Sequence, residues 1–135
     1  MEARTARRRL QSARVGHFAS VTGENGAHVV PCCFVLDGDT LYWAVDDVKP
    51  KSTSALQRLR NIAANDRASL LVDHYDEDWA RLWWVRVDGR ARTVGDADER
   101  SRAVSLLTEK YEQYRSAPPP GPMVAVDIAS WRAWP

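Results

Sequence analysis

Short stretches in which apolar and polar residues alternate recur along the chain, and they predict a mainly β protein with inserted helices. Six strands are expected, at residues 15–22, 28–36, 40–46, 67–75, 82–94 and 123–131. Apolar residues at helical spacing predict helices at residues 55–65 and 97–114, and a short helix is expected at residues 3–13. The prolines of 118–122 cannot join a helix or a strand ladder, so they predict a loop. This order predicts a small antiparallel barrel with helical excursions, in the α+β class.

The junction between the third strand and the helix that follows it carries two lysines and two hydroxyl groups. These residues are Lys49, Lys51, Ser52 and Thr53. Ser52 or Thr53 is a natural N-cap for the helix. The free N–H groups and the positive dipole end of a helix start, beside two ammonium groups, favour an anion and most economically a phosphate. Solvated lysines and an ordinary N-cap are the alternative, and the local sequence leaves both open.

Length and charge set limits on the class of protein. The 135 residues predict a single domain over 1–135, in which residues 1–14 form a basic N-terminal helix or arm. A net charge of +1 gives no general case for binding nucleic acid or a membrane. No apolar stretch has the length of a membrane span or the position of a signal peptide, so we expect a cytoplasmic protein.

The cysteines, histidines and tryptophans narrow the chemistry further. Cys32 and Cys33 are adjacent, so they alternate across a predicted strand and one of them is expected to face the core as a small hydrophobe. The three histidines are scattered and no metal-ligand spacing is present, so no metal site is expected. Six tryptophans imply a large buried aromatic surface, in a core, in a dimer interface or around a planar ligand.

No protein-based reactive group stands out. The chain lacks a Gly-x-Ser-x-Gly elbow, a Gly-x-Gly-x-x-Gly loop and a Walker motif, so the catalytic residues are unknown. His28, His74 and Tyr75 are the candidate proton donors, and each is better explained as structural. A phosphate anchor with aromatic walls suits a protein that holds a cofactor with its own chemistry.

Several segments taken in order resemble one family. They are residues 28–31 (His-Val-Val-Pro), 44–53 (from Ala-Val-Asp-Asp to Lys-Pro-Lys-Ser-Thr), 60–72, 73–79 and 81–90. Together they resemble the flavin/deazaflavin split-barrel superfamily, the pyridoxamine-5′-phosphate-oxidase-like proteins. Within it, the chain is most similar to the short actinobacterial branch of probable F420-dependent oxidoreductases. The resemblance covers residues from about 15 to 134.

The resemblance implies a six-stranded split barrel of the FMN-binding type, working as a homodimer with two cofactor sites at the interface. It assigns the ribityl phosphate to Lys49, Lys51, Ser52 and Thr53. It places the cofactor ring along Val30, Pro31, Cys32 and Cys33, and the ribityl chain along Ala44, Val45 and residue 46. Aromatic residues implied to close the site, some from the other subunit, are Trp79, Trp83 or Trp84, and Trp131 or Trp134.

The function that the resemblance implies is hydride transfer from reduced F420 to an unidentified small organic acceptor. FMN shares the ribityl phosphate and is the alternative cofactor, and a non-catalytic carrier of flavin, F420 or haem is the alternative function. Lysines replace the arginine-rich phosphate contacts of the pyridoxamine oxidases, and the C-terminus lacks their Arg-x-His motif, so pyridoxal phosphate chemistry is not expected. The acidic tail of F420 would favour a basic groove, for which the N-terminal arginines, Arg58 or Arg60 are candidates.

Overall fold

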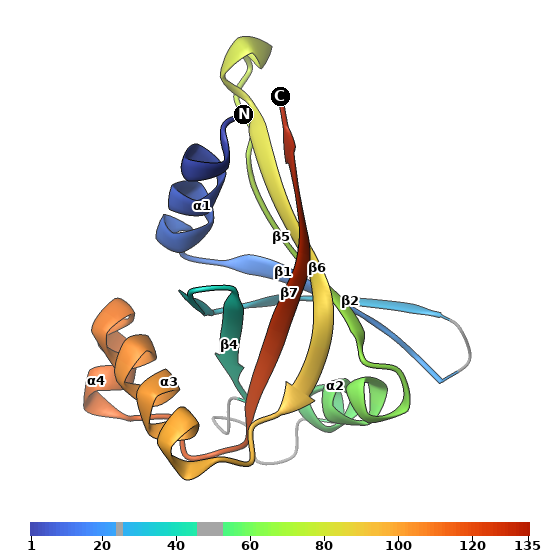
Figure 1. The fold of residues 1–135 in the computed structure, drawn as a ribbon, viewed down its shortest axis with the longest axis vertical. Coiled ribbons are helices and arrows are strands. Elements are labelled where there is room, and N and C mark those ends of the chain that lie inside the picture. The colour runs from blue at the N-terminus through green and yellow to red at the C-terminus, as the bar shows by residue number, and fades with distance from the viewer. Residues whose placement is uncertain (24–25, 46–52) are drawn as a thin grey trace.

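The fold is a curled antiparallel sheet with helices against it (Figure 1). The computed structural model describes residues 1–23, 26–45 and 53–135, and within these ranges the sheet has seven strands. The strands are β1 (Gly16–Val21), β2 (Ala27–Cys32), β3 (Val35–Asp37), β4 (Thr40–Ala44), β5 (Arg67–His74), β6 (Trp83–Thr93) and β7 (Met123–Trp134). The helices are α1 (Ala3–Ser12), α2 (Thr53–Ala64), α3 (Ala97–Lys110), α4 (Glu112–Ser116) and the 3-10 turn η1 (Trp79–Arg81). The spatial order of the strands is β2-β1-β5-β6-β7-β4-β3, so the split-barrel expectation is confirmed as a half-barrel.

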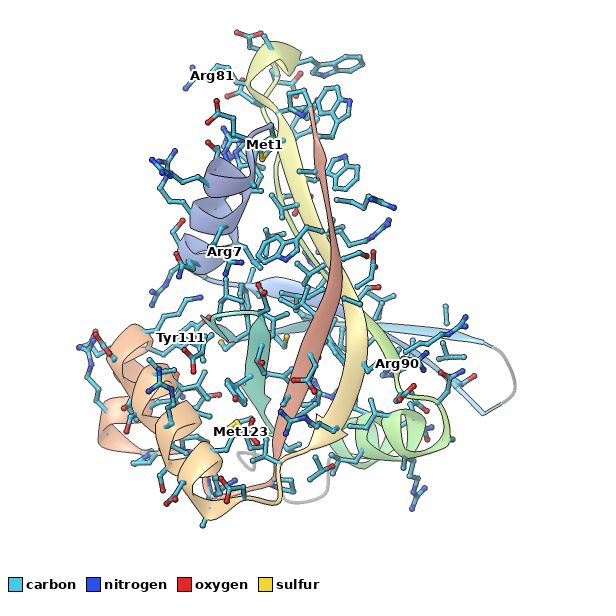
Figure 2. All side chains as sticks on the ribbon, viewed as in Figure 1. Met1, Arg7, Arg81, Arg90, Tyr111 and Met123 are labelled. Atoms are coloured by element: carbon cyan, nitrogen blue, oxygen red, sulfur yellow. The ribbon has the colours of Figure 1, made fainter. Side chains whose placement is uncertain are left out.

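Alternation of side chains separates the two faces of the sheet. Phe18, Leu70 and Val87 point to one face and are buried, whereas their chain neighbours point to the other. The buried face holds the main core, which α1 covers with Ala6 and Leu10. A second cluster lies where α3 packs beside β4 and β7; Figure 2 marks Met123 in this part of the molecule. None of the described helices is long and apolar enough to cross a bilayer.

One expected strand is two strands in the structure. The segment expected as a single strand at 28–36 breaks after Cys32 and resumes at Val35, and its two parts lie at opposite edges of the sheet. The break is held from outside the sheet, because the Tyr111 hydroxyl accepts the N–H of the buried Phe34 at 3.0 Å. The same Tyr111, with extended backbone angles, divides the helix expected at 97–114 into α3 and α4. Residue 46, expected at the end of the third strand, lies outside the described residues.

The long strands β6 and β7 pair along almost their whole length, and the register shifts once, between Asp88 and Gly89. Such a bulge sharpens the local twist and bend of the strand. At this point the backbones approach so closely that a Cβ on residue 89 would overlap the carbonyl oxygen of Asp127. Glycine is therefore required at residue 89.

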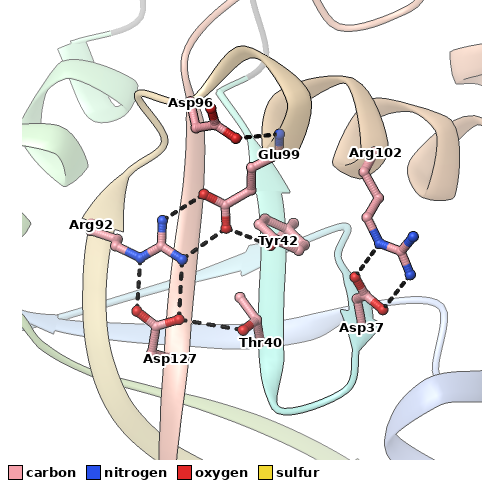
Figure 3. Close-up of polar contacts among 8 residues, drawn as sticks. All are labelled: Asp37, Thr40, Tyr42, Arg92, Asp96, Glu99, Arg102 and Asp127. Carbon is pink, nitrogen blue, oxygen red and sulfur yellow. Dashed lines mark hydrogen bonds and ion pairs between the residues drawn. The ribbon is translucent and has the colours of Figure 1, made fainter.

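An ionic network joins the start of α3 to the sheet (Figure 3). Arg92 of β6 contacts both oxygens of Glu99 at 2.8 Å and both oxygens of Asp127, the nearer at 2.7 Å. The Tyr42 hydroxyl donates to Glu99 at 2.6 Å, and the Asp96 side chain caps α3 by accepting the Glu99 N–H. Every charged group of this network has a partner, so the role of the network is to hold α3 against the sheet.

The hydrogen bonds from Arg92, and then from Tyr42, lower the pKa of Glu99 to about 2. Because this folded-state pKa lies below the unfolded one, the stabilisation is complete above the unfolded pKa and is lost as the pH falls through the folded value. We expect the free energy of unfolding to decrease between about pH 5 and pH 2, and this decrease to be smaller in Glu99→Gln. Denaturant unfolding at a series of pH values measures it. Glu109→Gln on the same helix should keep the full slope, and an equal slope in Glu99→Gln would contradict the role of the network.

Candidate functional site

The predicted cofactor site centres on the junction between β4 and α2. The main-chain N–H of Val45, just after β4, donates to Pro122 at 2.9 Å, and α2 begins at Thr53. A helix therefore starts where the sequence predicts an anion site. The predicted anchors Lys49, Lys51 and Ser52 lie outside the described residues, so the phosphate assignment stays a prediction.

Two buried N–H groups beside this junction have no acceptor in the part of the chain that the structure describes. The guanidinium of Arg58, on α2, lies 5.2 Å from the ring centroid of Trp43, a β4 side chain that is 1% exposed. Within the described residues, neither Trp43 Nε1 nor Arg58 Nε has a hydrogen-bond partner. An unpaired buried donor costs about 1–3 kcal/mol, and in native structures it usually has a ligand or a water as its partner. Trp43 and Arg58 therefore offer donors to a bound group that carries acceptors.

Polar side chains continue along the same face of α2. Gln57 donates to Asn61 at 2.7 Å, and Asn61 contacts Ser20 of β1 at 3.4 Å, with Asn61 and Ser20 both buried. His28 lies opposite Ser20 in the β1–β2 register, and its Nδ1 is a further buried atom without a partner among the described residues. The inner side of α2 thus carries polar side chains beside Leu59 and Ile62, which pack in the core.

The residues predicted to line the cofactor ring, in β2 and just after it, do not share one face. Val30 and Cys32 pack against the main core, whereas Pro31 and Cys33 are exposed. Burial, partly opposed by the charge of Arg58, raises the pKa of the Cys32 thiol to about 12. Cys32 is therefore a neutral core side chain, as expected for one of the two cysteines, and not a thiolate nucleophile.

The residues predicted along the ribityl chain also point in different directions. Val45 belongs to the main core, whereas Ala44 packs against the second cluster, under α3. Alternation along β4 explains this, because neighbouring residues of a strand face opposite sides. A ligand that runs along this strand would therefore contact its backbone and only one of these two side chains.

The predicted aromatic closers lie at the other end of the molecule. Trp79, in η1, is 69% exposed, and Trp84 of β6 lies opposite Trp134 of β7. Trp83 and Trp131 pack instead toward the core, and the guanidinium groups of α1 cover their rings at about 4.9 Å. Figure 1 places η1 at the opposite end of the long axis from α2. A single chain therefore does not bring Trp79 or Trp84 to the junction.

The candidate proton donors are also dispersed. His74 stacks on Trp83, with ring centroids 6.1 Å apart, and it lies 3.8 Å from Asp76. Tyr75 is 61% exposed near the end of the β5–β6 hairpin. His28 lies on β2, in a different part of the sheet. The structure does not gather these three side chains into one acid–base site.

A groove that the sequence analysis did not predict lies on the outer face of the sheet. Its volume is about 590 Å³, and Ala19, Ser69 and Asp88 line it from β1, β5 and β6. The Ser69 hydroxyl donates to Asp88 at 2.5 Å, and Arg86 approaches the same carboxylate at 3.0 Å. The sequence indicates this groove only by small residues at outward-facing positions of three strands. These residues become neighbours only when the strands take their order in the sheet.

Known proteins share this architecture. The family described as pyridoxamine 5′-phosphate oxidase matches residues 3–135. No protein with a curated function matches the sequence. Among solved structures, a conserved hypothetical protein from Mycobacterium tuberculosis superposes with a TM-score of 0.80 at 16% identity, over 99% of this chain and 84% of that one.

Two further structures carry cofactor descriptions. A FAD-binding protein from Mesorhizobium loti has a TM-score of 0.72 at 22% identity, over 98% of this chain and 92% of that one. A haem-binding protein from Mycobacterium smegmatis has a TM-score of 0.76 at 20% identity, over 96% of this chain and 52% of that one. At these identities the likeness establishes the fold alone. The match of the family over nearly the whole sequence goes further: this chain belongs to the pyridoxamine 5′-phosphate oxidase family.

Proposed function

We propose that this protein is an oxidoreductase that binds coenzyme F420 at the β4–α2 junction, with FMN as the alternative cofactor. The observation that carries the proposal is the pair of buried donors, Trp43 Nε1 and Arg58 Nε, which have no partner among the described residues. Membership of the family supports the same kind of cofactor. A flavin or deazaflavin ring and its ribityl chain carry oxygen and nitrogen acceptors, which suit two N–H donors.

The residues present fit such a group by their chemistry. Lys49, Lys51, Ser52 and Thr53 would hold the phosphate, because ammonium groups, hydroxyls and a helix start all favour an anion. Arg58 and Trp43 would donate to the acceptors, and their burial would keep water from competing. The bound cofactor would supply the hydride chemistry. The protein's part is to orient the ring and the acceptor, and no side chain is assigned as an acid or a base.

We propose further that two copies form the working unit. The acidic residues Asp76, Glu77 and Asp78 lie beside η1 at the hairpin end, whereas Arg58 lies on α2 near the other end of the long axis (Figure 1). Trp79 and Tyr75 are exposed at the acidic end. A head-to-tail pair of chains would bring this aromatic end to the partner's basic junction, where it could close the cofactor site. Sedimentation of the purified protein tests this arrangement.

Titration of the purified protein with F420, FMN, FAD and haem tests the cofactor. We expect saturable quenching of F420 fluorescence and weaker binding of the other three. Lys51→Ala should weaken F420 binding by about 1–3 kcal/mol, the size of a charge-assisted contact. Tight binding of FMN without binding of F420 would mean that FMN, and not F420, is the cofactor.

The same complex separates an enzyme from a carrier. An enzyme should oxidise bound reduced F420 when a small organic acceptor such as a quinone is added, and the rate should saturate with acceptor concentration. A carrier would hold the cofactor without this turnover. Binding of haem alone would favour the carrier and would overturn the proposed oxidoreductase.

A further inference from the structure

Three cationic side chains lie around the C-terminal end of α3. Arg115 donates to the carbonyl oxygens of Thr108 and Glu109 at 2.9 and 2.6 Å, and Arg14 donates to that of Lys110 at 2.8 Å. These contacts satisfy carbonyls that a helix end leaves open. In the described part of the chain, no carboxylate lies within 4.0 Å of the side-chain nitrogens of Arg14, Lys110 or Arg115.

Lys110 lies in the middle of this cationic group. Its Nζ donates to the carbonyl oxygen of Phe34 at 2.9 Å and lies 4.0 Å from the centroid of the Phe34 ring. The Tyr111 ring centroid is 5.3 Å from the same nitrogen, and Arg14 stacks on that ring at 4.8 Å. Lys110 is partly exposed, and the neighbouring Cys33 is exposed, so small molecules can reach this position. Neither the carbonyl nor the rings provide the full negative charge that would hold an ammonium group strongly.

The pKa of Lys110 responds to these surroundings. Burial, and then the charge of Arg14, lower it to about 8, while the thiols of Cys33 and Cys32 act in the opposite direction. Tyr111 is neutral here, because burial raises its pKa to about 12. Near neutral pH a substantial share of Lys110 is therefore the unprotonated amine, which is the nucleophilic form.

Lysine is rare in this chain, so its occurrence at residue 110 is notable. Arginine occurs at sixteen positions, whereas lysine occurs only at Lys49, Lys51 and Lys110. A guanidinium would keep the carbonyl contact and the ring contact but would not lose its proton. At residue 110 a lysine amine can therefore react with an electrophile, whereas the guanidinium of an arginine would stay protonated and could not.

We propose that Lys110 is an acyl-acceptor site whose amine takes an acyl group from an anionic donor of the acyl phosphate class. The lone pair of the neutral amine forms a bond to the acyl carbon, and the bond from that carbon to the phosphate oxygen breaks. Phosphate leaves with the electron pair, the amine gives its extra proton to solvent, and an amide remains on Lys110. Positive charge at Arg14 and Arg115 raises the local concentration of such a donor.

Incubation of the whole protein with acetyl phosphate, followed by mass spectrometry of its peptides, tests the site. At pH 7.5 we expect the acetylation rate of Lys110 to exceed those of Lys49 and Lys51 by roughly tenfold, because the gain in neutral amine outweighs its lower basicity. The rate should rise with pH and level off above about pH 8.5. Lys110→Arg removes the modified peptide and serves as the control.

Comparison with p-nitrophenyl acetate, an uncharged donor, tests the donor class. The preference for Lys110 over the other two lysines should be larger with acetyl phosphate than with the ester. An equal or smaller preference would overturn the anionic class of donor. Lys110 reacting no faster than Lys49 and Lys51 with both donors, or a rate that still climbs at pH 10, would overturn the site itself.

Discussion

Gly89→Ala is expected to lower the free energy of unfolding by about 3 kcal/mol, the upper range for a forced overlap in a packed interior. The added Cβ would overlap the carbonyl oxygen of Asp127 on the neighbouring strand, and it would also lie about 3.0 Å from Ile128 Cα. These are main-chain atoms of the long β6–β7 pairing, so they cannot move aside as a side chain can. Denaturant unfolding followed by tryptophan fluorescence measures the loss.

Gly95→Ala is the matched control. It makes the same chemical change in the loop between β6 and α3, where a Cβ would meet nothing within 4 Å. We expect its free energy of unfolding to stay within about 0.5 kcal/mol of the parent protein. Equal stability of the two variants would mean that the bulge at residue 89 adapts to a side chain.

Arg58→Met is expected to weaken cofactor binding by about 1–3 kcal/mol, because it removes the guanidinium donors on the inner side of α2. The same change should lower the free energy of unfolding by less than about 1 kcal/mol. Arg58 Nε has no acceptor to lose among the described residues, and its contact with the Trp43 ring is of that size. Cofactor titration and denaturant unfolding of one preparation measure both quantities.

Arg102→Met controls for the loss of one positive charge. Arg102 lies on α3, where its guanidinium binds both oxygens of Asp37 at 2.6 and 3.1 Å. Its replacement should leave cofactor affinity unchanged. If Arg58→Met costs stability but no affinity, Arg58 supports the fold and the cofactor lies elsewhere.

Most of the fold could be predicted from local patterns in the sequence. β5 and β6 follow from alternating side chains at residues 67–75 and 82–94, because each strand has one buried face. α2 follows from the apolar spacing at 55–65. These elements owe their form to neighbours within a few residues, which a sequence displays directly.

The errors in the fold came from contacts between distant residues. Residues 28–36 are apolar enough for one strand, but Phe34 is held by Tyr111, which lies 77 positions further along the chain. Tyr111 also ends α3, although its apolar side chain fits the helical spacing. No local sequence pattern indicates that Tyr111 both holds Phe34 and ends α3.

The site was harder to predict than the fold, for the same reason. A family resemblance assigns whole segments, so it placed Val30, Pro31 and Cys32 together although alternation separates them. The resemblance also grouped Trp79 with the β4–α2 junction, although within one chain Trp79 and α2 lie at opposite ends of the molecule (Figure 1). The donors of Trp43 and Arg58 have no sequence signature, because they are recognised only by the absence of a partner among the described residues.

The break at Cys33 and Phe34 limits how the half-barrel can move. β2 and β3 form the two edges of the sheet, yet only two residues separate them along the chain. Such a link spans at most about 11 Å, so the edges cannot part at this end. Any separation of the two edges would therefore be smallest at residues 33–34 and largest toward Ala27 and Asp37. Crosslinks at those far ends would restrict such a separation, whereas crosslinks beside residues 33–34 would add no restriction.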